Sequence, residues 1–129
     1  MSGSPELRAV DEVLAAAPPS LRELAADLMG AVRKLHPEAY VTAWPRQNII
    51  GFGFGPKKMS EHYVYIAVQS KHVNAGFYYG AALPDPSSIL EGTGKNFRHV
   101  KVRTLREARA ADLLALLAAA RDERAAALK

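Results

Sequence analysis

The stretch HYVYIAVQSKHVNAGFYY, residues 62–79, decides the fold. Its two halves, residues 62–69 and 72–79, are rich in β-branched and aromatic residues and alternate as half-buried strands do. Only Ser70 and Lys71 separate them, which is the length of a tight hairpin loop. We therefore predict two neighbouring antiparallel strands at the centre of the protein.

Three further segments of the same kind extend this hairpin into a sheet. They are residues 39–44, 48–54 and 97–103, and Pro, Gly, Ser or Lys residues separate the segments from one another. Short links favour antiparallel pairing of consecutive strands. The sequence thus predicts a five-stranded antiparallel meander.

Helical patterns precede and follow the strands. Ser4 and Pro5 are typical of a helix start, and residues 20–23 and 104–107 both have the form of a capping box. The second helix carries an apolar stripe of Leu21, Leu24, Leu28, Val32 and Leu35, and the last helix one of Leu113, Leu114, Leu116 and Leu117. We predict one α+β domain over residues 1–129, with two N-terminal helices and one C-terminal helix covering one face of the sheet.

Alternation within the strands divides their side chains between a covered and an open face. The covered face is expected to hold Val64, Ile66, Val73, Phe77, Val100 and Val102. The open face is expected to be aromatic and basic, with Tyr63, Tyr65, Gln69, His72, Asn74, Tyr78, Phe97, His99, Lys101 and Arg103. Trp44, at the end of the first strand, is interpreted as a core residue at the sheet edge.

Composition narrows the classes of function. The chain has 129 residues and a net charge of +4, and the middle, from Tyr40 to Thr104, holds eight Lys and Arg against three Asp and Glu. Such a positive field favours anionic partners. Cysteine is absent, which excludes disulfides, thiolate metal sites and a cysteine nucleophile and fits a reducing cytosol. With neither a secretory signal nor a stretch of about 18 apolar residues, we expect a cytoplasmic protein and no membrane contact.

Known catalytic and phosphate-binding motifs do not fit. The stretch LEGTGK, residues 90–95, has Ile89 where a phosphate loop needs its first glycine, and Asn96 follows the lysine. We interpret Gly92 and Gly94 instead as turn residues with positive φ. The four histidines lack metal-ligand spacing, and no G-x-S-x-G motif occurs. The motifs predict no cofactor and no metal site.

The run HVNAGFYYGAALPDPSSILEGTGKNFRHVKV, residues 72–102, resembles the YdhG-like family of small bacterial domains. The matching parts are residues 72–77, 80–83, 85–86, 90–95 and 98–99. The resemblance covers roughly residues 20–120, and the chain departs from the family pattern after Trp44. It implies an α+β domain with a frataxin-like layout, and some relatives are described as iron chaperones.

Three functions follow as hypotheses. The first is a non-enzymatic intracellular binding domain that uses the open face and the turn at residues 92–99 against a small-molecule or anionic partner, nucleic acid included. Its candidate ligand-binding residues are Tyr63, Tyr65, Asn74, Tyr78, Lys95, His99 and Lys101. The second, implied by the resemblance, is an iron-binding chaperone, for which Glu6, Asp11 and Glu12 are the available carboxylates. The third is an enzyme of unassigned type with polar groups converging around Asp85 and His99.

Overall fold

The computed structural model describes residues 5–129 and shows an α+β fold. The Ser4 helix cap predicted above lies outside the described residues. The elements, with 3-10 turns written η, are α1 (Pro5–Ala16), α2 (Pro19–Leu35), β1 (Tyr40–Trp44), η1 (Pro45–Gln47), β2 (Ile49–Gly53), α3 (Lys58–Glu61), β3 (His62–Val68), β4 (Val73–Phe77), η2 (Gly80–Ala82), β5 (Arg98–Val102), α4 (Leu105–Ala108) and α5 (Ala111–Ala127).

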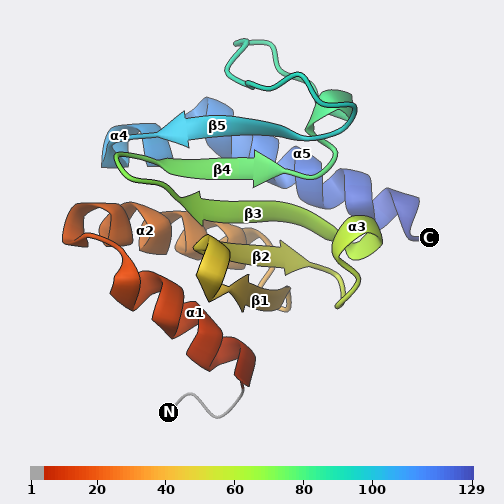
Figure 1. The fold of residues 1–129 in the computed structure, drawn as a ribbon. Coiled ribbons are helices and arrows are strands. Elements are labelled where there is room, and N and C mark those ends of the chain that lie inside the picture. The colour runs from red at the N-terminus through yellow and green to blue at the C-terminus, as the bar shows by residue number, and fades with distance from the viewer. Residues whose placement is uncertain (1–4) are drawn as a thin grey trace.

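The five strands form one antiparallel sheet in the order β1-β2-β3-β4-β5, so the predicted meander is confirmed (Figure 1). At its centre Ile66 pairs with Ala75 across the β3–β4 hairpin. The hairpin closes through Gln69, whose backbone N–H donates to the carbonyl oxygen of His72 at 2.9 Å. The link at residues 70–71 therefore sets the register of the two central strands.

Helices α2 and α5 lie behind the sheet in Figure 1, and α1 runs along the edge strand β1. A single cluster of buried apolar side chains joins the three helices to the sheet. Five of the residues predicted for the covered face are fully buried: Val64, Ile66, Val73, Phe77 and Val102. Val100 is half-buried and packs against the same core, because β5 is an edge strand. Among the helices that the structure describes, only the short α3, at the β2–β3 corner, reaches the other face, through Lys58.

A β-bulge in β3 makes the alternation of its side chains differ from the prediction. The register between β2 and β3 shifts at Phe52/Gly53, so that Phe52 pairs with Val64 and Gly53 with His62. Tyr63 is the extra residue, and bulged residues place two successive side chains on one side of a strand. As a result Tyr63 joins Val64 in the core and His62 takes the open face. The prediction of Tyr63 on the open face was wrong.

The two predicted capping boxes have different outcomes. Thr104 caps α4, where its hydroxyl oxygen accepts the backbone N–H of Glu107 at 3.1 Å. Ser20 makes no cap, because α2 begins one residue earlier at Pro19. Pro18 is extended, as residues before proline are, and proline is favoured at the first helical position. Ser20 therefore lies inside the helix.

The predicted last helix is two helices, α4 and α5, separated by Arg109 and Ala110. Leu113, Leu116 and Leu117 are buried as expected, whereas Leu114 is 37% exposed because it lies at the flank of the buried face. Near the other end of α5, Arg124 holds the helix against the β2–β3 corner. Its guanidinium donates to the Ser60 carbonyl oxygen at 2.9 Å and lies 3.6 Å from the centre of the Tyr79 ring.

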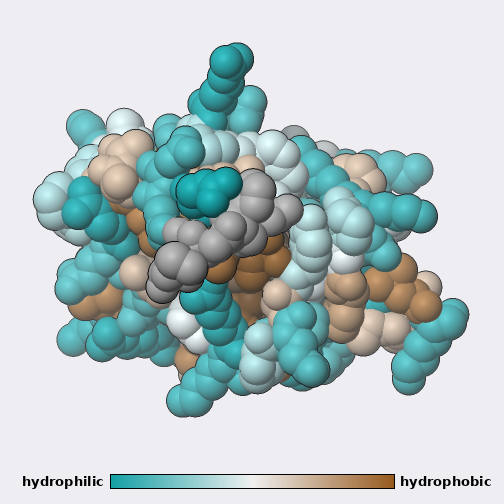
Figure 2. Space-filling view, turned by 90° about the horizontal axis from the view of Figure 1, so that it is seen from below, coloured by the Kyte–Doolittle hydropathy of each residue, from teal (hydrophilic) through white to brown (hydrophobic). Residues whose placement is uncertain are grey.

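The β1 side of the molecule is shown in Figure 2. Hydrophilic residues cover most of this side, and hydrophobic residues appear in separate small patches. In the described part of the chain, no helix has both the length and the apolar character needed to cross a membrane.

Candidate ligand-binding site on the open face of the sheet

Five rings gather on the open face and are called here the aromatic cluster: Trp44, His62, Tyr65, Tyr78 and Phe97. Tyr78 lies at its centre. The ring of Tyr78 meets the rings of Phe97, Tyr65 and His62 edge to face at centroid distances of 5.3, 5.4 and 5.8 Å. Edge-to-face contact is a favourable geometry for aromatic pairs, so the rings hold one another in place.

Glycines beneath the rings make this arrangement possible. A Cβ at Gly76 would lie 1.9 Å from Cζ of Tyr65, which pairs with Gly76 across β3 and β4. A Cβ at Gly51 would lie 2.9 Å from Cζ3 of Trp44. The two rings thus lie directly over bare backbone. Side chains at these positions would push the rings off the sheet.

A hollow of about 190 Å³ opens among these rings, lined by Ile49, Lys58, Tyr65, Tyr78 and Phe97. Its walls are mostly apolar, and their one charged group is the ammonium group of Lys58, which lies 4.9 Å from the centre of the Trp44 ring. Phe97 is 38% exposed, whereas Tyr78 is only 1% exposed. Tyr78 therefore belongs to the floor of the hollow and Phe97 to its rim.

His62 is the unusual member of the aromatic cluster. It is fully buried, and neither ring nitrogen has a hydrogen-bond partner among the described residues. Burial lowers the pKa of His62; the backbone of Gly55, which lies near the ring without the geometry of a hydrogen bond, and the carboxylate of Glu61 oppose that shift. Leaving a buried polar group unpaired costs about 1–3 kcal/mol. Native structures contain few such groups, and a functional role is one of the reasons for which they are retained.

The tyrosines of the hollow are neutral donors. Burial raises the pKa of Tyr65, and burial together with the proximity of Tyr65 raises that of Tyr78. Both phenols thus keep their protons at neutral pH. The hollow therefore offers aromatic faces, hydroxyl groups and a single cation from Lys58.

Of the predicted ligand-binding residues, the structure brings Tyr65 and Tyr78 together in this hollow. Tyr63 lies on the other side of the sheet, where its hydroxyl is 2.7 Å from Nδ1 of His36 and burial raises its pKa to about 12.

Asn74 is half-buried opposite Lys101 and does not line the hollow. Ile49, Lys58 and His62 were missed, and Phe97 was expected on the open face but not named as a ligand-binding residue. For His62 the obstacle was the bulge, which no local sequence pattern announces.

The basic strand does not form one positive patch. Lys101 pairs with Glu91 at 3.7 Å, and the backbone N–H of Arg103 donates to the Glu107 carboxylate at 2.7 Å. His99 pairs with Gly76 and forms a backbone bridge with Glu91. Acidic residues close in space thus offset cations that stand together in the sequence.

The turn before this strand bends back on itself. Arg98 donates from one guanidinium nitrogen to the carbonyl oxygens of Gly94 and Phe97, at 2.5 and 2.6 Å. Gly92 has a φ of +124°, as predicted, whereas Gly94 has no positive φ. Lys95 is exposed and does not line the hollow. The turn therefore contributes the ring of Phe97 to the site, and not the charge of Lys95.

Asp85 has a structural use for both of its carboxylate oxygens. They accept the backbone N–H groups of Ile89 and Leu90 at 3.0 and 2.9 Å. Neighbouring Ser88 has a φ of +56°. These contacts fix the chain after Asp85 as a turn, which agrees with Asp85 being a turn residue between Pro84 and Pro86, and no helix forms at residues 87–90.

Trp44 also differs from its prediction. It is half-buried on the open face above Gly51 and does not enter the core. As for metals, no group of three or more His, Asp or Glu side chains in the described part of the chain is placed to hold an ion. Asp11 and Glu12 are exposed on α1, and the Glu6 side chain lies outside the described residues.

Comparison of the chain with protein-family models, with curated proteins and with solved structures found no match. The resemblance to the YdhG-like family remains a prediction from the motif at residues 72–102.

Proposed function

We propose that the protein is a non-enzymatic binding domain that accepts a planar aromatic ring bearing an anionic group. The ring would enter the hollow between Tyr65, Tyr78 and Phe97. The observation that carries this proposal is an aromatic hollow with one cation, Lys58, on a sheet face that no helix covers. Stacking of one ring on aromatic side chains contributes about 1–3 kcal/mol in nucleic-acid complexes, which suits a small ligand.

The groups at this site favour binding over catalysis. Tyr65 and Tyr78 hold their protons at neutral pH, and His62 is shielded from solvent beneath them. A general base must reach the proton that it abstracts, so a shielded imidazole is poorly placed. The proposal keeps the cytoplasmic location and the YdhG-like relationship, both of which rest on the sequence alone.

Fluorescence of Trp44 tests the proposal directly, because Trp44 is the only tryptophan of the chain and contacts Lys58. The probes are benzoate, with one ring, and AMP, with a fused ring and a phosphate. We expect a saturable change in emission with at least one probe. Phe97→Ala and Lys58→Met should each weaken binding about tenfold, since one removes a wall and the other the counter-charge.

Lys57→Met is the matched control, because Lys57 is the exposed neighbour of Lys58 and does not line the hollow. Equal affinity in the parent, Phe97→Ala and Lys58→Met would place any bound ring elsewhere. Failure of both probes to perturb Trp44 at millimolar concentration would also count against the proposal.

A further inference from the structure

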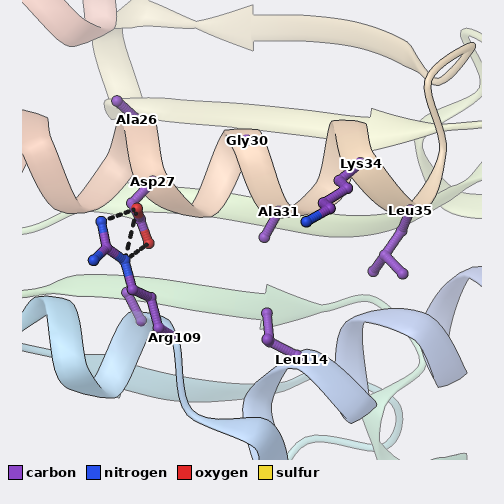
Figure 3. Close-up of a pocket in the computed structure, with 9 residues that line it drawn as sticks. Ala26, Asp27, Gly30, Ala31, Lys34, Leu35, Arg109 and Leu114 are labelled. Carbon is purple, nitrogen blue, oxygen red and sulfur yellow. Dashed lines mark hydrogen bonds and ion pairs between the residues drawn. The ribbon is translucent and has the colours of Figure 1, made fainter.

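A second hollow lies on the helix side of the sheet, between α2 above and α4 and α5 below in Figure 3. Its volume is about 510 Å³, within the range of roughly 300–1,000 Å³ usual for small-molecule sites. We call it the interhelical groove. Its apolar walls come from Ala31 and Leu35 of α2 and from Ala108 and Leu114 on the other side. Leu114, which the sequence assigned to the core, points into it (Figure 3).

Gly30 leaves the α2 side of the groove open. A Cβ built on Gly30 would meet no atom within 4 Å, so packing does not require glycine here. Glycine inside a helix costs about 1 kcal/mol relative to alanine. The helix carries this cost at a position that widens the groove.

Charge distinguishes the two ends of the groove. At one end Arg109 and Asp27 form an ion pair at 2.9 Å, with a second guanidinium contact at 3.1 Å. Toward the other end the ammonium group of Lys34 turns over the groove near Ala31 (Figure 3). Lys34 forms no ion pair with a carboxylate of the described residues. One end is therefore neutralised, and the other has a cation available for a ligand.

We propose that the interhelical groove binds the alkyl chain of an anionic amphiphile, a fatty-acid-like carboxylate, with its head group on Lys34. The walls are aliphatic and mostly small, and no aromatic ring lines the groove, so a flexible chain fits better than a planar ring. From Ala26 to Leu35 the helix advances roughly 14 Å, at about 1.5 Å per residue, which suits a medium-length chain.

A protein partner fits this groove less well. Stable protein interfaces bury about 800 Å² on each partner and have large aromatic or arginine anchors near their centre. In the described part of the chain, the apolar side chains of the groove are two leucines and three alanines, and the arginine at its end already binds Asp27. A second copy of the chain is therefore an outcome that the test must exclude, and not the proposal.

The test uses decanoate, kept below its micelle concentration, and decanol as its uncharged counterpart. Binding is followed by calorimetry and by amide chemical shifts of the whole protein. We expect decanoate to shift the amides of Gly30, Ala31 and Leu114, and decanol to bind about tenfold more weakly. Lys34→Met should weaken decanoate binding about tenfold, since it keeps the length of the side chain and removes its charge.

Gly30→Leu fills the groove and should abolish binding. This variant should fold, because a Cβ at position 30 meets no atom within 4 Å, the rest of the side chain has the volume of the groove to enter, and leucine is a better helix former than glycine. Its melting temperature should equal or exceed that of the parent. Lys71→Met is the matched lysine control, since Lys71 lies in the β3–β4 turn and does not line the groove.

Unchanged decanoate binding in Gly30→Leu would overturn the proposal, as would equal affinities for decanoate and decanol. Dimerisation of the parent that Gly30→Leu abolishes would identify the groove as a contact between copies and would also overturn it. The aromatic hollow is a separate site, so failure here leaves the proposed function standing.

Discussion

At the scale of single residues, His62 is the residue of the open face that combines burial, ring nitrogens unpaired among the described residues and contact with other aromatic rings. It is fully buried, neither ring nitrogen has a hydrogen-bond partner in the described part of the chain, and its ring contacts Tyr78 and Trp44 at centroid distances of 5.8 and 6.1 Å. Such a residue contributes less to folding than an apolar one of the same size. Its contact with Tyr78, at the floor of the hollow, suggests that His62 is retained for a purpose other than stability.

His62 should make the fold sensitive to acid. Because burial lowers its pKa below 6.5 in the folded protein, the folded state favours the neutral ring. Stability is then complete above pH 6.5 and is lost as the pH falls through the folded pKa, since the unfolded chain binds the proton more readily. We expect the free energy of unfolding in urea to fall between pH 7.5 and 5.5, and to fall less in His62→Leu.

Burial also lowers the pKa of His36, so the difference between proteins is the informative quantity. His72→Leu, at a histidine in the β3–β4 turn outside the aromatic cluster, should retain the dependence of the parent. If His62→Leu and the parent show the same loss of stability with pH, His62 is not the responsible group.

Individual residues were predictable from the sequence wherever alternation holds without interruption. Val64, Ile66, Val73 and Phe77 are buried as expected, because a period of two places them on one face. Tyr63 broke the rule, since one extra residue in a strand reverses the faces of its neighbours. The spacing of residues in one strand does not show where a residue of that strand has no partner in the neighbouring strand.

At the scale of elements, the two capping boxes provide a matched comparison. Thr104→Ala should lower the free energy of unfolding by about 1 kcal/mol, because the Glu107 N–H loses its acceptor. Ser20→Ala should have no effect or stabilise slightly, because Ser20 makes no cap and alanine is the better helix former. Thermal or urea unfolding of both variants measures the difference. Equal destabilisation would contradict the helix start assigned to Pro19.

Helix and strand positions followed from local patterns, but the break between α4 and α5 did not. Neither Arg109 nor Ala110 is a residue type that breaks helices, as glycine and proline do. The backbone of Ala110 is nevertheless extended, with φ −63° and ψ 137°. The causes are distant in sequence. Arg109 pairs with Asp27 of α2, and Ala108 is fully buried in the core. Contacts across 82 residues leave no signal in a window of a few residues.

At the scale of the whole molecule, charge counted along the chain overstated the basic patch. Glu91 lies beside Lys101, and Glu107 binds the backbone at Arg103. Neighbouring residues in space thus cancel part of a field that a linear count assigns to the strand. The same reasoning explains why the candidate site shifted from the cations of β5 to the aromatic rings.

Nucleic-acid binding should accordingly be weak. We expect a labelled single-stranded oligonucleotide to bind the parent only at low salt. Combined replacement of Lys95, Lys101 and Arg103 by alanine should change the salt dependence by no more than about one phosphate contact. A titration at several salt concentrations measures this slope. A change worth about three contacts would restore the polyanion hypothesis.

The strand order also bears on how the chain reaches its fold. Every strand pairs only with its neighbours in sequence, so the sheet can grow hairpin by hairpin without closing a long loop. The packing of α5 on β3 does not form between neighbours in sequence, because α5 follows all five strands in the chain. During synthesis from the N-terminus, the sheet can thus form while part of its apolar face is still bare. The nascent chain then depends on the ribosome-proximal segment to complete its core, and until α5 emerges this face is the region most exposed to aggregation and to chaperones.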